Sequence, residues 1–318
     1  MKAVVLFGHR KLSVLDVETP IPPRGWALIK VELTGICGTD KAFYSGTYKL
    51  FKSPLIPGRE VVGKIVEGPE DLVEERVVPE INFSCRRCWY CRSGLYTHCP
   101  NKKTLGIDFD GGMAEYFIAP VEALHRFNGS PEEGIFVEPL AAILRALSLS
   151  YPKPTDKIAV IGSGAIAWLL VQVLGNVYKL DVDVVVRRNS VKANYFKKIA
   201  DIVYVDEVRE SYYDMVFEVS GDPRAIDLAI KIAKPLGVIH LKSTPGAVAS
   251  MSSTIAVIKE LNIVCSRCGT FKEFEHAIKL LKEHLVEPIL NQVYSLDNAQ
   301  KAFEEALLGQ YFRIALRP

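Results

Sequence analysis

Apolar and polar residues follow different patterns in the two halves of the chain. In the first half, short runs typical of β-strands, such as 27–33 and 61–66, are separated by glycine and proline turns. After the proline-containing segment 151–154, apolar strands alternate with helical segments. That alternation predicts a parallel sheet with helices on both faces. The change near Leu149 predicts a boundary between a mostly β unit and an α/β unit.

The second half should contain a regular series of elements. We expect strands at 158–161, 182–186, 202–205, 215–219, 238–241 and 263–265, and helices that begin at Ala165 and Val191 or span 224–234. From about Phe271 the pattern predicts an amphipathic helix, an extended piece at 291–294, a helix over 298–308 and a closing strand. This tail could return to the first unit.

Composition and charge are typical of a globular protein. The chain has 318 residues, of which 49% are hydrophobic and 24% charged. Its 39 Lys and Arg nearly balance 37 Asp and Glu, so no single-sign field attracts nucleic acid or an anionic membrane. No apolar run reaches the roughly 18 residues of a membrane-spanning helix, and residues 1–16 lack the apolar block of a signal peptide. We expect a cytoplasmic protein that binds neither nucleic acid nor membrane.

A cluster of cysteines predicts a metal site. Four of the seven cysteines lie close together, at Cys85, Cys88, Cys91 and Cys99. Four thiolates at these spacings can enclose a tetrahedral ion, and a set without an open position is typical of structural zinc. An iron–sulfur cluster also uses four cysteines, but its usual spacings match less well, and disulfides fit poorly with a reducing compartment. The sequence therefore predicts a structural zinc lobe at 85–99.

The segment 158–167 has the pattern of a nucleotide-binding turn. An apolar strand runs into Gly162, which would form a tight turn, and Gly164 would let phosphates approach the helix that follows. Ala167 is a small residue that permits close packing of helix on strand. Such a turn directs helix amides at a pyrophosphate, with an ordinary strand–helix turn as the alternative. The predicted cofactor-binding residues are Gly162, Ser163, Gly164, Ala165 and Ile166.

Residues after later strands indicate which dinucleotide binds. The second strand ends in Arg187, Arg188 and Asn189, without the acid that usually bonds the ribose of NAD. Two guanidiniums suit a 2′-phosphate, so we predict a preference for NADP, with NAD as a second choice and solvated loop charges as the alternative. Ser220 and Ser243 follow the fourth and fifth strands, where the nicotinamide is expected.

Together these motifs resemble the medium-chain dehydrogenase/reductase superfamily, in its zinc-containing alcohol and polyol dehydrogenase branch. The matching segments are 35–40, 57–63, 111–116, 138–141, the cysteine lobe and the Gly162 turn. The resemblance implies an α/β fold with a GroES-like, mostly β catalytic domain at 1–143 and a Rossmann NAD(P)-binding domain, a doubly wound parallel sheet, at 144–270. Residues 271–318 would return to the catalytic domain. Relatives form homodimers or homotetramers, so one of these is expected.

The resemblance also implies a catalytic site. In this family the cysteine of the Cys-Gly-Thr-Asp motif binds a catalytic zinc, which falls on Cys37, while Thr39 matches a proton-relay hydroxyl and Glu138 a carboxylate ligand. The family's Gly-His-Glu motif reads Gly-Arg59-Glu60 here, and arginine cannot bind zinc. Cys37, Glu60 and Glu138 remain as predicted zinc ligands. In a zinc-free alternative, Arg59 pairs with Glu60 or Glu138 and presents its charge to the substrate oxygen.

The resemblance also bears on Ala42 and Arg313 and on the reaction. Ala42 stands where many relatives carry a histidine that passes the proton to solvent, and Arg313 matches a position that reaches the cofactor pyrophosphate in some relatives. The resemblance implies hydride transfer between NADP and an alcohol, polyol or sugar or its carbonyl partner. The alternative is an NADP-binding redox sensor or scaffold protein with weak or no activity, because the changes at Arg59 and Ala42 both alter the catalytic machinery.

Overall fold

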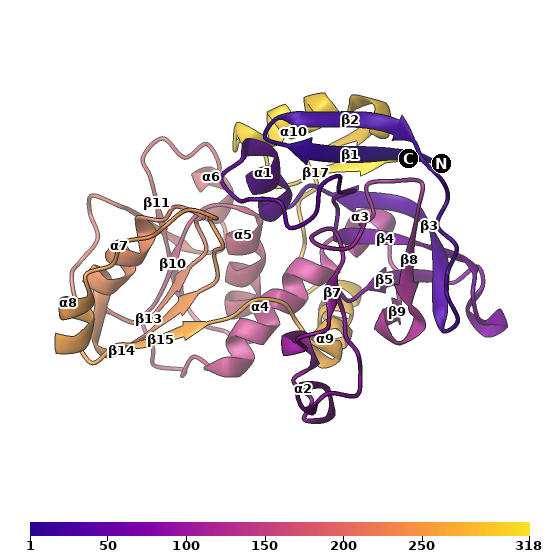
Figure 1. Cartoon of the computed structure of the whole chain (residues 1–318). Helices are drawn as coiled ribbons and strands as arrows, with labels where there is room; N and C mark the ends of the chain where they lie inside the picture. The colour runs from indigo at the N-terminus through magenta and orange to yellow at the C-terminus, as the bar shows by residue number, and fades with distance from the viewer.

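The computed structural model describes residues 1–318 and contains two large β-sheets with helices between and around them (Figure 1). A mixed sheet is built mainly by the first half of the chain, and a fully parallel sheet by the second half. The parallel sheet, drawn in pink to orange, lies beside the mixed one, and α4 (Val137–Leu149) lies between them (Figure 1). The predicted fold class is confirmed.

The mixed sheet has seven strands, and two of them come from the C-terminal tail of the chain. Its order is β16 (Gln292–Ser295), β17 (Ile314–Arg317), β3 (Trp26–Gly35), β4 (Glu60–Glu67), β5 (Arg76–Pro79) and β9 (Leu124–Arg126), with β8 (Tyr116–Pro120) also paired to β3. Two antiparallel strand pairs stand beside it: β1 (Lys2–Gly8) with β2 (Lys11–Asp16), and β6 (Asn82–Phe83) with β7 (Lys103–Thr104). Because β17 pairs antiparallel with β3, the tail returns to the sheet of the first half.

The parallel sheet has the strand order of a doubly wound dinucleotide-binding fold. Its order is β12 (Asp201–Tyr204), β11 (Val182–Val186), β10 (Ile158–Ile161), β13 (Tyr213–Glu218), β14 (Ala233–Leu241) and β15 (Asn262–Cys265). The order reverses between β10 and β13, the switch point at which such sheets bind ligands. All four residues of β10 are buried, as expected for a strand covered on both faces.

Helices cover the sheets and join them. They are α1 (Gly38–Ser45), α2 (Trp89–Arg92), α3 (Pro131–Gly134), α4, α5 (Ala165–Gln172), α6 (Ala193–Phe196), α7 (Ala225–Ile232), α8 (Ser253–Ile258), α9 (Phe271–Lys282) and α10 (Ala299–Leu307). A single core of 33 buried residues runs from Val62 on β4 through Leu140 on α4 to Val160 on β10. This shared core fixes the position of one sheet relative to the other. No helix combines the length and the apolar character needed to cross a bilayer.

One predicted element is shorter than expected. The helix that should begin at Val191 is reduced to the four residues of α6, followed by turns up to Ala200. The next strand, β12, already starts at Asp201, so the chain has few residues in which to form a longer helix. The other predicted strands and helices lie within a few residues of their expected bounds.

The predicted domain division meets a continuous helix. Residue 143, the expected last residue of the catalytic domain, lies in the middle of α4. The contacts of α4 extend to β4 and β5 on one side and to α5 and β15 on the other. The division into 1–143, 144–270 and 271–318 therefore stays a prediction.

His240, on β14, gives the fold a measurable dependence on pH. Its ring is fully buried and stacks on Phe217 with the centroids 4.6 Å apart, and Nε2 lies 3.2 Å from the Ser150 carbonyl. Burial lowers the pKa of His240 from about 6.5 to about 4. The unfolded chain therefore binds a proton at a pH where the folded chain does not. This contribution to stability is present above pH 6.5 and is lost as the pH falls toward 4.

We expect the folded state to lose up to about 3 kcal/mol of unfolding free energy through His240 alone between pH 7 and pH 4. Urea unfolding of the wild type and of His240→Gln at several pH values measures this loss, because glutamine keeps a donor for Ser150 but does not titrate. The difference between the two proteins should shrink as the pH falls. A difference that is constant with pH would contradict the assignment.

Candidate active site

The four cysteines of the predicted zinc lobe lie together with the spacing of a tetrahedral site. Sγ of Cys88 is 3.5 Å from that of Cys91 and 3.8 Å from that of Cys99, and Sγ of Cys99 is 3.5 Å from that of Cys85. A zinc–sulfur bond of about 2.3 Å places the sulfurs of a tetrahedron about 3.8 Å apart. The sulfur positions therefore fit a zinc ion.

The backbone of the lobe supports thiolates at these positions. Backbone N–H groups of Arg87 and Cys88 lower the pKa of the Cys85 thiol to about 6. The short helix α2 begins directly after Cys88, so one turn of chain separates Cys88 from Cys91. Four sulfurs would fill the coordination sphere, and an ion held there would fix the lobe without an open position for substrate.

We expect Cys91→Ser to reduce bound zinc from one ion to less than half an ion per chain. It should also lower the thermal midpoint by about 5–10 °C, because binding a structural metal contributes to folding. Elemental analysis and thermal unfolding measure both effects. Cys265→Ser is the matched control, since Cys265 is exposed at the end of β15. Unchanged zinc content in Cys91→Ser would contradict the predicted ligand set.

The glycine turn after β10 has the backbone of a phosphate-binding turn. Gly162 has a φ of +130°, and a Cβ on it would lie 3.0 Å from Cα of Ser220, so a side chain would be strained and crowded there. Gly164 is the N-cap of α5, and nothing lies within 4 Å of the position of its Cβ. The first amides of α5, which include those of Ala165 and Ile166, have no partners within the helix. Free amides at the start of a helix are suited to bind a pyrophosphate, which is the group predicted for this turn.

Polar side chains stand next to this turn at the carboxyl ends of neighbouring strands. Ser163 Oγ lies 2.9 Å from Ser190 Oγ, beyond the end of β11. Ser220 donates through Oγ to the Glu218 carboxylate at 2.7 Å, and Ser243 Oγ accepts from the Gly221 amide at 2.8 Å. The predicted cofactor residues Ser163, Ser220 and Ser243 therefore line one edge of the parallel sheet.

The two arginines after β11 have different surroundings. Arg188 is held by ion pairs with Asp206 and Glu207, and its guanidinium lies 4.7 Å from the centroid of the Tyr204 ring. Arg187 is exposed and makes no ion pair within the chain, and Asn189 is an exposed turn residue. Of the two guanidiniums, that of Arg187 is the one available to a ligand.

Cys37 and Thr39 are positioned by the start of α1. Cys37 is the N-cap, where its thiol accepts from the Asp40 amide at 3.4 Å while the Asp40 carboxylate accepts from the Cys37 amide at 2.9 Å. This reciprocal cap fixes the sulfur at the end of the helix. Burial raises the pKa of the Cys37 thiol well above its usual range. Thr39, in the first turn, is buried, and its hydroxyl makes no hydrogen bond within the chain.

Arg59 lies at the centre of the predicted catalytic residues. It follows Gly58, whose φ of +98° and closeness to Met113 leave no room for a Cβ. Burial lowers the pKa of the Arg59 guanidinium, but nearby charged and ionisable groups raise it by more, so its pKa is raised overall. These groups are Cys37, Asp40, Glu138 and Glu60. Its Nη1 atom is buried without a hydrogen-bond partner. The structure therefore brings Cys37, Arg59, Glu60 and Glu138 into one cluster.

A catalytic zinc does not fit this cluster as it stands. Glu60 Oε1 is 3.0 Å from Nη2 of Arg313, whose Nη1 donates to the Ile36 carbonyl at 2.9 Å. The only group of three or more potential metal-ligating residues in the chain is that of the four lobe cysteines. Cys37, Glu60 and Glu138 do not bring their donor atoms together, and the Arg59 cation lies among them. The predicted catalytic ligand set is thus not assembled.

Arg59 and Arg313 make contacts that differ from the expected ones. Arg59 makes no ion pair within 4.0 Å, so the expected direct pair with Glu60 or Glu138 is not formed, although both carboxylates raise its pKa. Arg313 is buried and holds Glu60, where burial raises the carboxyl pKa to about 7. The observed contacts of Arg313 are structural, and its contact with the cofactor pyrophosphate stays a prediction.

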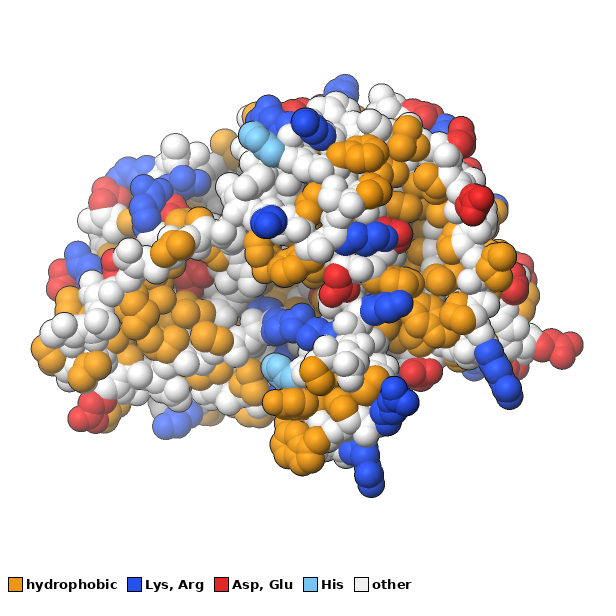
Figure 2. Space-filling model, viewed as in Figure 1, with side chains coloured by type: hydrophobic (Ala, Val, Ile, Leu, Met, Phe, Trp, Pro, Cys, Tyr) orange, Lys and Arg blue, Asp and Glu red, His pale blue; other side chains and the backbone are white.

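The cluster adjoins the carboxyl edge of the parallel sheet. Gly246, in the loop after β14, lies so close to the loop after α1 that a Cβ would be 2.7 Å from the Thr47 carbonyl. Lys242, directly after β14, is half-buried and lies near Arg59 and Glu138. Cys37 and Lys242 thus both lie near Arg59, so the cluster reaches the carboxyl edge of the parallel sheet. Figure 2 shows Lys and Arg side chains in the hollow between the two parts of the molecule.

Lys242 can be placed in this region from the sequence, because it directly follows a central strand, and side chains at the carboxyl ends of parallel strands face bound ligands. What the sequence does not reveal is that Lys242 lies near Arg59 and Glu138. A single lysine in a loop has no distinctive spacing that would indicate these contacts.

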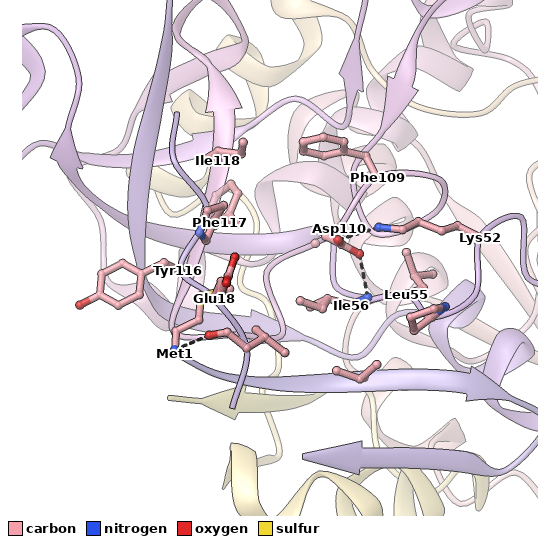
Figure 3. A pocket seen from close by; sticks show the side chains of 15 residues that line it. Met1, Glu18, Lys52, Leu55, Ile56, Phe109, Asp110, Tyr116, Phe117 and Ile118 are labelled. Atoms are coloured by element: carbon pink, nitrogen blue, oxygen red, sulfur yellow. Dashed lines mark hydrogen bonds and ion pairs between the residues drawn. The ribbon is translucent and has the colours of Figure 1, made fainter. Parts of the chain in front are cut away.

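An apolar cavity lies elsewhere in the molecule. It has a volume of about 400 Å³ and is lined mostly by apolar residues around Met1, Leu55 and Phe109 (Figure 3). Lys52 and Asp110 form an ion pair at 2.6 Å along its wall. None of the predicted site residues lines this cavity, so it is separate from the candidate active site.

Comparisons with known proteins agree with the fold. Residues 23–129 match the alcohol dehydrogenase GroES-like domain. D-arabitol-phosphate dehydrogenase of Enterococcus avium is 26% identical over 97% of this chain and 94% of its own length. A solved structure, a provisionally assigned zinc-binding dehydrogenase from Sinorhizobium meliloti bound to NADP, superposes with a TM-score of 0.87 at 26% identity over 100% of this chain and 99% of its own.

The class of protein follows from these comparisons. An uncharacterised zinc-type alcohol dehydrogenase-like protein of Haemophilus influenzae is 30% identical over 88% of this chain and 87% of its own length. The chain belongs to the zinc-type alcohol dehydrogenase family, within the medium-chain dehydrogenase/reductase superfamily. It is accordingly an NAD(P)-dependent oxidoreductase of the alcohol and polyol dehydrogenase class.

Proposed function

We propose that the protein interconverts an alcohol, polyol or sugar and its carbonyl partner with NADP as the preferred cofactor, and that Arg59 takes the place of the catalytic zinc. The observation that carries this proposal is the position of the Arg59 cation, whose buried Nη1 has no partner and which lies among Cys37, Glu60 and Glu138 beside the carboxyl edge of the parallel sheet. A zinc ion in the cysteine lobe would be structural only.

The residues around the glycine turn would bind the cofactor. The amides after Gly162 suit the pyrophosphate, and Arg187 suits a 2′-phosphate because no carboxylate in the chain already holds it. Ser220 and Ser243 stand where the nicotinamide end is expected. The nicotinamide, when bound, supplies the hydride chemistry, and the protein supplies position and charge.

The residues around Arg59 would act on the substrate oxygen. The free Nη1 of Arg59 can donate to an oxygen that gains negative charge during hydride transfer. Cys37, Glu60 and Glu138 keep the guanidinium charged in a buried place. Thr39, whose hydroxyl has no partner in the chain, is positioned to exchange the alcohol proton, as its motif implies.

Replacing Arg59 tests this role. We expect Arg59→Met to lower kcat by about 100-fold while NADPH binding stays unchanged, because the lost contact acts on the reacting oxygen. Arg59→Lys should retain more activity than Arg59→Met because it keeps a cation. Steady-state kinetics over alcohols and sugars, fluorescence titration with NADPH and zinc analysis give the three readouts.

Zinc content and turnover distinguish the alternatives. Two zinc ions per wild-type chain would contradict the replacement of the catalytic metal by Arg59. One zinc ion, NADPH binding and no turnover across the panel would favour the redox sensor or scaffold instead.

The choice of cofactor depends on Arg187 more than on Arg188. We expect Arg187→Ala to raise the KM for NADP about tenfold and to leave the KM for NAD nearly unchanged, since a bidentate contact with the 2′-phosphate is lost. Arg188→Ala is the matched variant and should have a smaller effect, because Arg188 is already paired with Asp206 and Glu207. Equal use of both cofactors by the wild type, unchanged in either variant, would remove the argument for NADP.

The protein is also proposed to form a homodimer or homotetramer. In support, β15 is an edge strand of the parallel sheet, and α8, the helix that precedes it in the chain, exposes three apolar side chains, Ile255, Val257 and Ile258. Unpaired edge strands and exposed apolar residues are typical places for another chain to pack. The small-molecule substrate remains the only other partner that we propose.

A further inference from the structure

Lys242 is a half-buried cation whose hydrogen-bond donors the protein itself leaves mostly unused. It directly follows β14, and its backbone amide donates to the Glu218 carbonyl at 3.0 Å. Its ammonium group donates to the Arg267 carbonyl and to no other atom of the chain. No carboxylate lies within ion-pair distance of Nζ. An ammonium has three N–H donors, so two of them have no partner within the chain.

The charges near Lys242 are mainly positive. Burial is the largest effect and lowers the pKa of Lys242 to about 8. Glu138 and Cys268 favour its charged form, whereas Arg59 and Arg267 oppose it. Around Lys242, two arginines therefore stand against one carboxylate. Taking a cation partly out of water without a matching anion is costly unless a partner compensates.

A second lysine shows what a purely structural lysine is like in this fold. Lys259 donates to the carbonyls of Ile230, Lys231 and Ala233 at 2.9, 2.9 and 2.8 Å, so all three of its N–H donors are used. Lys242 donates to one carbonyl only, and this single hydrogen bond does not explain why a cation stands at this position. The difference indicates that the remaining donors of Lys242 serve a ligand.

The position of Lys242 indicates the kind of ligand. It lies at the carboxyl edge of the parallel sheet, near Arg59 and Glu138. Arg59 is the group proposed to act on the reacting oxygen, so a group bound by Lys242 belongs to the same substrate molecule. A neutral hydroxyl would leave the excess positive charge unbalanced, whereas an acidic group would balance it.

We propose that the substrate is an alcohol or carbonyl compound that also carries an acidic group, a phosphate or a carboxylate, and that Lys242 binds this group. The inference rests on the proposed function, because it assigns the substrate class of the same site. Arg59 addresses the reacting oxygen and Lys242 the acidic group. The ion pair with Lys242 would select acidic substrates over neutral polyols of similar size.

Matched pairs of compounds test the proposal by binding and by turnover. The probes are sn-glycerol 3-phosphate against glycerol, and D-gluconate against D-sorbitol. Calorimetric titration of the NADPH-loaded protein should give at least about tenfold tighter binding for the acidic member of at least one pair. The pair that responds tells phosphate from carboxylate. NADP-linked turnover of the same compounds is measured separately.

Three variants make the test specific. Lys242→Met should abolish the preference for the acidic member, and Lys242→Arg should keep most of it. Lys259→Met is the matched control, which should lower thermal stability but leave the preference intact. Thermal unfolding of all variants shows whether Lys242→Met is folded.

The outcomes separate this inference from the proposed function. Acid-selective binding that depends on Lys242 but comes without turnover would support the site and contradict the dehydrogenase activity. Turnover of neutral compounds that equals or exceeds that of the acidic ones would support the activity and overturn the substrate class. An acid preference that survives in Lys242→Met, or no binding of either acidic probe, would also overturn the inference.

Discussion

The packing of α4 between the two sheets is the interaction on which the site depends. One continuous core joins Val62 on β4, Leu140 on α4 and Val160 on β10, so neither sheet buries its apolar face alone. Because Glu138 lies in the first turn of this helix, the same packing brings its carboxylate toward Arg59 on the mixed sheet and Lys242 on the parallel sheet. The packing that joins the two units therefore also assembles the candidate catalytic cluster.

The sequence predicts the fold well because its signals are local. Continuous apolar runs mark the buried strands β10 and β11, and the glycine turn at Gly162 requires a backbone that few other residues adopt. The cysteine spacing likewise predicts the lobe, since one short segment carries all four sulfurs. The length of α6 could not be predicted, because it depends on how soon the chain must enter β12.

The candidate site was only partly predictable because its contacts join distant parts of the chain. Motifs identify Cys37, Arg59, Glu60 and Glu138 one at a time, but no motif shows that Arg313 binds Glu60. That pair joins residues more than 250 positions apart and removes one carboxylate oxygen from the predicted zinc ligands. The ion pairs of Arg188 with Asp206 and Glu207 are also tertiary contacts. The two adjacent arginines in the sequence do not reveal them.

The exchange of histidine for arginine at position 59 has consequences for the whole cluster. A neutral imidazole would leave the positive charge to a metal, which then needs the thiolate and the carboxylates as ligands. A guanidinium carries its own charge, so those groups serve to keep it ionised in a buried place. Once Glu60 is paired with Arg313, Glu138 is the one carboxylate of the predicted set without an ion pair within the chain. The positive charge left over between Arg59 and Lys242 makes a neutral substrate the less suitable occupant of the space between the two sheets.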